Sequence, residues 1–99
     1  MNINKAIDGN VMTMEIEGRL DTVSAPELEA EISAIPDDVT ALVLDLENLE
    51  YISSAGLRVL LTLHKKMSLK DGMTVKHPNE LVMEVFEVTG FSDILNIEE

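Results

Sequence analysis

The chain has 99 residues, of which 45% are hydrophobic and 26% are charged, and its net charge is −12. These proportions are typical of one globular domain, here residues 1–99, and the acidic balance disfavours nucleic acid, whose phosphates it would repel. The chain has no cysteine, which excludes disulfides, and no apolar run reaches the roughly 20 residues of a membrane span. We therefore expect a cytoplasmic protein with no membrane partner, and the high charge favours a monomer.

Two strands joined by a tight turn are predicted at the beginning of the chain. Residues 2–7 alternate weakly between apolar and polar side chains, and residues 11–17 alternate strictly. The Asp8-Gly9 pair between them is typical of a hairpin turn. The strict alternation predicts which side chains of the second strand face the core, namely Met12, Met14 and Ile16.

The first helix is predicted to begin at Ser24 and to end at Pro36. Ser24, followed three residues later by Glu27, matches a capping box, in which each side chain bonds to the other residue's backbone N–H. The apolar run of residues 41–44 then predicts a strand covered on both faces, which ends at Asp45. The apolar residues of the helix recur at helical spacing, and they are Leu28, Ile32 and Ile35.

The second half of the chain predicts two more helices and one more strand. A polar turn leads to a helix at about residues 55–69, and Asp71-Gly72 then turns the chain into a strand at residues 73–76. A third helix begins near Asn79 and ends at Gly90. One face of this helix is predicted to be buried, with Leu81, Val82, Val85, Phe86 and Thr89.

The element order is therefore β-β-α-β-α-β-α. It indicates an α/β fold in which helices pack on a small mixed sheet. A hydrophobic tail, residues 91–95, is expected to pack back on the core.

Catalytic and metal sites are not predicted. His64 is ten residues into the helix that starts at Ser54, which places it roughly 15 Å along the axis and out of hydrogen-bond reach. His77 precedes Pro78 at a strand end, and geometry leaves it open as a base, but no Gly-x-Ser-x-Gly motif is present. The histidines and acids show no metal spacing, and there is no phosphate-binding glycine loop. We expect no enzyme activity, no metal and no cofactor.

Two adjacent hydroxyls, Ser53 and Ser54, lie where a strand connection ends and a helix begins. Free backbone N–H groups and the positive end of the helix dipole gather at such a place. One alternative is that either serine only caps the helix. The other is a working site, because the small residues Ala55 and Gly56 leave room for another molecule to approach.

Four cations follow the serines within one segment: Arg58, Lys65, Lys66 and Lys70. They predict either a solvated helix face with cations near the C-terminus, or a cationic stripe that faces a partner.

The stretch from Leu42 to Leu61 strongly resembles the STAS domain of bacterial anti-sigma factor antagonists, whose hallmark is Asp-Ser-Ser/Thr-Gly-Leu at a helix start. Residues 18–21 with 25–28, and residues 82–95, resemble other segments of the same family, so the resemblance covers essentially the whole chain. Ser54 aligns with the serine that the family phosphorylates. Two positions depart from the motif, because Ser53 replaces the usual Asp and Ala55 replaces the second Ser/Thr.

The resemblance implies a STAS fold and a switch. The unmodified domain would bind an anti-sigma factor that is a serine kinase of the histidine-kinase ATPase fold, and so release a sigma factor. The kinase would phosphorylate Ser54, with Ser53 as the alternate acceptor, and a PP2C-type phosphatase would reset it. An alternative function is a non-switching STAS scaffold in a signalling or lipid-transport assembly. The partner-binding residues implied by the resemblance are Asp21, Ser53, Ser54, Ala55, Gly56, Leu57 and Arg58.

Overall fold

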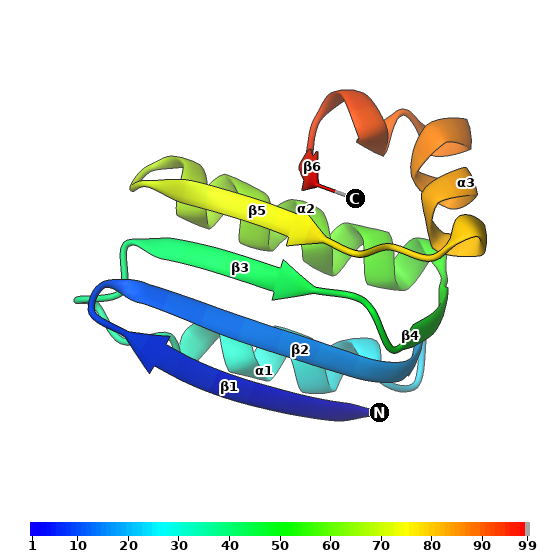
Figure 1. The fold of residues 1–99 in the computed structure, drawn as a ribbon. Coiled ribbons are helices and arrows are strands. Elements are labelled where there is room, and N and C mark those ends of the chain that lie inside the picture. Colours follow the sequence, from blue (N-terminus) through cyan, green and yellow to red (C-terminus); the bar gives the residue numbers. More distant parts are fainter. Residues whose placement is uncertain (99) are drawn as a thin grey trace.

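The computed structural model describes residues 1–98, in which one mixed sheet carries its helices on one face and at one end (Figure 1). The strands are β1 (Asn2–Asp8), β2 (Val11–Leu20), β3 (Ala41–Asp45), β4 (Leu49–Ile52), β5 (Gly72–Lys76) and β6 (Asn96–Glu98). The helices are α1 (Ala25–Ser33), α2 (Ser54–Ser68) and α3 (Glu80–Thr89), followed by a 3₁₀ turn at Phe91–Asp93. The predicted α/β order is confirmed, with two short strands added, β4 and β6.

The strand order in the sheet is β1-β2-β3-β5-β6. β1 and β2 form the predicted antiparallel hairpin, whose turn contains Gly9 at a φ of 63°. β2 and β3 are parallel, and β3 with β5 and β5 with β6 are parallel as well. The carboxyl ends of β3 and β5 therefore point to the same edge of the sheet, where α3 also lies (Figure 1).

β2 is longer than predicted and pairs with two different strands in turn. Residues 11–15 pair with β3, and residues 18–20 pair with β4. The register shifts next to Gly18, which has a φ of 97°, a conformation that glycine adopts without steric cost. The prediction that the strand ends before Gly18 is therefore wrong, since the bulge bends the strand and carries it on to Leu20.

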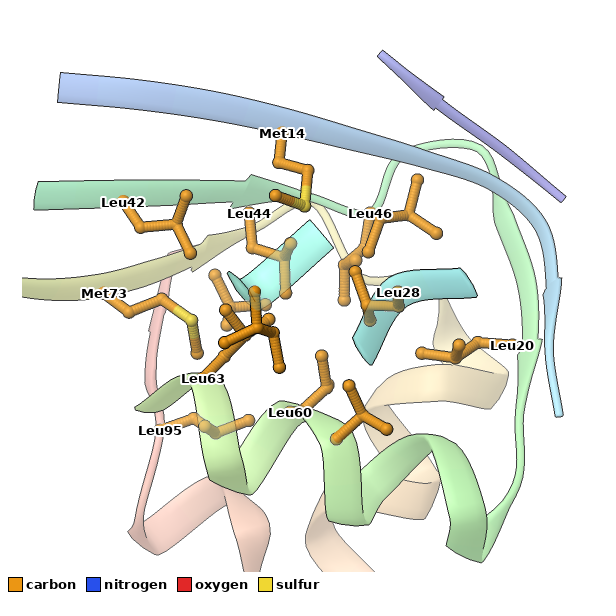
Figure 2. Packing of buried hydrophobic residues seen from close by; sticks show 14 of the residues in the cluster. Met14, Leu20, Leu28, Leu42, Leu44, Leu46, Leu60, Leu63, Met73 and Leu95 are labelled. Carbon is orange, nitrogen blue, oxygen red and sulfur yellow. The ribbon is translucent and has the colours of Figure 1, made fainter. Parts of the chain in front are cut away.

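The core lies between the sheet and the helices α1 and α2 (Figure 2). As predicted, Met12, Met14 and Ile16 of β2 are buried. Burial alternates along β3, where Leu42 and Leu44 are buried and Val43 is half-buried. β3 is thus not covered on both faces, because the helices pack on one face of the sheet (Figure 1).

The starts of α1 and α3 differ from one another in their capping. Asn79 caps α3 as predicted, by accepting a hydrogen bond from Val82 N at 2.8 Å. Ser24 makes no such bond to α1, so the predicted capping box with Glu27 is wrong. α3 ends at Gly90, which has a φ of 82°, as expected for a helix-ending glycine.

The third helix buries only part of its predicted apolar face, because Val85 is half-buried and Leu81 and Thr89 are exposed. Val82 and Phe86 are fully buried, whereas Leu81 is 47% exposed. The chain then returns to the core at Leu95, which is 5% exposed. None of the helices in residues 1–98 has the length and apolarity needed to cross a membrane.

Two of the four cations that follow the serines make hydrogen bonds within the fold. Lys66 Nζ donates to the carbonyl of Ile32 at 2.7 Å, at the end of α1. Lys70 Nζ donates to the carbonyls of Asp37 and Val39, each at 3.3 Å. The interpretation of a four-residue stripe facing a partner is therefore wrong for Lys66 and Lys70, whose side chains are used within the fold.

Candidate functional site

The start of α2 lies against the end of β2, because β4 pairs with the last residues of β2. Ser53 N donates to the carbonyl of Leu20 at 2.9 Å, so the chain enters α2 directly beside the point where β2 ends. Asp21 is the next residue after β2. The fold therefore brings Asp21 and the serine pair together, although more than thirty residues separate them in the sequence.

The two serines have different surroundings. Ser53 is the N-cap of α2, with extended backbone, and its Oγ accepts from Gly56 N at 3.4 Å. Ser54 is the first residue of the helix and is exposed. Its hydroxyl has no hydrogen-bond partner within residues 1–98. The capping alternative is thus realised by Ser53, and it leaves the hydroxyl of Ser54 free at the surface.

Gly56 and Leu57 lie beneath this surface. A Cβ at Gly56 would lie 2.7 Å from Leu20 Cγ and 2.9 Å from both Ile52 Cγ1 and the Leu20 carbonyl oxygen. Leu57 is 6% exposed. The small residue at position 56 therefore serves the close approach of α2 to β2 rather than room for another molecule.

Asp21 organises the turn between β2 and α1. Its Oδ1 accepts from Val23 N at 3.1 Å and from Ser24 N at 3.2 Å. The hydrogen bond from the backbone of Ser24 is the main cause that holds the pKa of Asp21 below its ordinary value. Ser24 completes the turn from a buried position, since its Oγ accepts from Asp21 N at 2.9 Å and donates to the carbonyl of Arg19 at 2.6 Å.

This turn displays an apolar residue that the sequence analysis did not single out. Val23 is 86% exposed, although its own backbone N–H and that of Ser24 both donate to Asp21 Oδ1. The sequence feature that could have singled it out is a β-branched residue within a polar segment.

A shallow groove of about 290 Å³ separates α1 from α2 next to the serines. Its walls include Thr22 after β2, Glu29 of α1, and Ala55 and Arg58 of α2. Arg58 is exposed. Neither histidine lines this groove, so within residues 1–98 it has no imidazole that could act as a base on Ser54.

The fold also assembles one cluster that sequence spacing did not reveal. Asp45, Glu47 and His77 each place a potential ligand atom within 4.8 Å of the others, at the carboxyl ends of β3 and β5. His77 Nδ1 lies 3.2 Å from Asp45 Oδ1. His77 is exposed, whereas His64 is half-buried, with its Nδ1 unpartnered. The separation of these residues in the sequence hid the cluster.

Known proteins share both the sequence and the fold. The chain is 39% identical, over 92% of its length and 79% of the relative's, to BtrV of Bordetella bronchiseptica, whose name places it among the anti-sigma factor antagonists. A crystal structure of an anti-sigma factor antagonist from Mycobacterium paratuberculosis superposes with a TM-score of 0.86 and 27% identity, over 97% of this chain and 83% of that one.

The fold is also that of SpoIIAA from Bacillus in its phosphorylated form, with a TM-score of 0.75 and 18% identity over 99% of this chain and 92% of that one. The predicted STAS fold is thereby confirmed. The family model of the STAS domain matches residues 2–99. The chain therefore belongs to the STAS domain family.

Proposed function

We propose that this protein is an anti-sigma factor antagonist that acts by binding and not by catalysis. In its unphosphorylated form it binds an anti-sigma factor, and this binding releases a sigma factor. Membership of the STAS family and a 39% identical relative named as such an antagonist support the proposal. The anti-sigma factor is itself a serine kinase, and the circuit operates in the cytoplasm with this protein as a monomer.

The observation that carries the proposal is the difference between the two serine hydroxyls. The hydroxyl of Ser53 accepts a hydrogen bond inside the helix cap, whereas that of Ser54 is exposed and unengaged. We therefore assign Ser54 as the phosphate acceptor. In the transfer, the Ser54 oxygen bonds to the γ-phosphorus of ATP, the bond from that phosphorus to the β–γ bridging oxygen breaks, ADP leaves, and the hydroxyl proton passes to a base of the kinase.

The phosphate acts on the interface and leaves the fold intact. A phosphoserine adds about −1.5 to −2 charges at neutral pH. At the first residue of a helix this charge is stabilised by about 0.3–1 kcal/mol, because the helix dipole presents its positive end there. Within a docked interface the same charge costs several kcal/mol, and each ~1.4 kcal/mol weakens binding tenfold.

The docking surface that we propose is smaller than the sequence implied. The exposed or half-exposed members are Asp21, Ser53, Ser54, Ala55 and Arg58. Val23 extends this surface beyond Asp21. Gly56 and Leu57 are buried and hold the surface in place from below. A PP2C-type phosphatase that removes the phosphate restores the binding form.

The test measures the affinity for the cognate anti-sigma kinase by calorimetry, for the wild type, Ser54→Asp and Ser68→Asp. We expect Ser54→Asp to weaken binding at least tenfold, since it places charge on the exposed serine. Ser68→Asp, at the far end of α2, is the control for added charge and should bind as the wild type does. If Ser54→Asp binds as tightly as the wild type, the alternative function of a non-switching STAS scaffold is favoured.

A further inference from the structure

We propose that Arg58 is the intramolecular counter-ion of phosphorylated Ser54. This inference rests on the proposed function, because it concerns the phosphorylated form. It adds a residue with a defined task to the switch: the guanidinium of Arg58 pairs with the phosphate one helical turn away.

The helix geometry brings the two side chains together. Ser54 is the first residue of α2, and Arg58 follows four residues later on the same helix. Side chains four residues apart are neighbours on a helix surface, with about 5–6 Å between their Cβ atoms. A long side chain on a helix also leans toward the N-terminus, which directs Arg58 toward Ser54 and not away from it. Both residues are exposed, so nothing buried has to move.

The charges around Arg58 leave it available. The ion pairs found among residues 1–98 are Lys5–Glu31, Arg19–Asp21, Lys76–Glu98 and His77–Asp45, and Arg58 is in none of them. The first turn of α2 contains no acidic residue. Glu29 of α1 lines the same groove, and no other carboxylate among residues 1–98 lines it. A phosphate dianion on the same helix carries more charge than Glu29 and has more acceptor oxygens for the guanidinium.

This pairing changes what a partner meets at the docking surface. Without phosphate, Arg58 presents a free cation at the rim of the groove. With phosphate, the guanidinium is turned to the neighbouring serine and the pair together is anionic. Phosphorylation therefore adds an anion and also withdraws the exposed cation of the groove.

The experiment installs phosphoserine at position 54 of the full chain by genetic encoding, so no kinase is required. ³¹P NMR then follows the second ionisation of the phosphate, whose ordinary pKa is about 6. We expect its pKa to be lower in the wild type than in Arg58→Gln by about 0.15–0.4 units, as for an exposed pair of this spacing. Arg58→Lys should retain part of the difference.

The matched control is Arg19→Gln. Arg19 is also exposed, but it lies over the ring of Tyr51 at 4.4 Å and pairs with Asp21. Arg19→Gln removes the same charge as Arg58→Gln, and we expect it to change the phosphate pKa by less. Equal shifts in the two variants, or no shift in Arg58→Gln, would overturn the proposal. Because the phosphate is encoded, these results are independent of whether a kinase modifies Ser54, which the binding and mapping experiments decide.

Discussion

The starts of α1 and α2 resemble one another in sequence and differ in what their serines do. Each helix follows a strand and has a serine at its N-cap position. At α1, Ser24 is buried and bonds backward to the end of β2, so its hydroxyl is fully used. At α2, the capping is done by Ser53, and Ser54 is left exposed. A serine at a helix start therefore has a structural role where its hydroxyl is hydrogen-bonded within the fold. It is open to modification where its hydroxyl is exposed and makes no hydrogen bond.

The largest effect is expected where α2 is seated on β2. Gly56→Val should destabilise the protein by about 2–3 kcal/mol, because added atoms collide with the Leu20 carbonyl and side chain. Gly56→Ala should lie between this variant and the wild type. Urea unfolding measures both, with Ser54→Ala as the control that adds no atom on the packed side. A Gly56→Val variant as stable as the wild type would contradict the packing described.

The next largest loss of stability is expected at the start of α1. Ser24→Ala should cost about 1–2 kcal/mol, because it leaves Asp21 N and the Arg19 carbonyl without their hydrogen-bond partner. The same urea unfolding measures it. A loss no larger than that of Ser54→Ala would show that the hydroxyl of Ser24 is not structural.

Replacing either serine at the start of α2 should change the free energy of unfolding by less than Ser24→Ala does. Ser53→Ala should lose about 0.5–1 kcal/mol, at the low end for a cap because the bond to Gly56 N is 3.4 Å long. Ser54→Ala should change stability by less than about 0.5 kcal/mol, since its hydroxyl bonds to nothing in the described chain. Thermal unfolding of both variants tests the order, and a larger loss at Ser54 would reverse the assignment of the cap.

The smallest change in stability is expected from low pH, which protonates Asp21 in the turn before α1. Because the folded-state pKa of Asp21 lies below its ordinary value of 3.8, its contribution is present above that value and is lost as the pH falls through the folded pKa. Asp21→Asn should therefore be less stable than the wild type at about pH 7, and the difference should shrink at about pH 3. Urea unfolding measures both variants. The same stability difference at both pH values would contradict this role of Asp21.

The sequence predicted most of the fold, since periodicity identified all three helices and four of the strands. It missed β4 and β6, which have four and three residues, because such short runs show too few repeats to reveal a period. It missed the end of β2 because glycine usually marks a strand's end, whereas Gly18 forms a bulge there. The capping box at Ser24 failed because Glu27 N donates to the Ser24 carbonyl and Ser24 N donates to Asp21 Oδ1, while the Ser24 hydroxyl bonds to the end of β2.

The structure corrects details of the candidate site, whose role as a partner surface stays a prediction. The motif around Ser54 predicts where this surface lies, because a serine pair before a helix is visible in the sequence alone. Whether Gly56 faces a partner or the core depends on how β2 bends, which local patterns do not show. The fixed exposure of Val23 likewise depends on hydrogen bonds made by Asp21 and Ser24.

The central claim is that Ser54, and not Ser53, is modified. Incubation with the cognate kinase and ATP, followed by peptide mass spectrometry, tests it most directly. We expect a single phosphate on Ser54, unchanged in amount in Ser53→Ala and absent in Ser54→Ala. Phosphate found on Ser53, or no phosphate on either serine with a kinase shown to be active, would contradict the account.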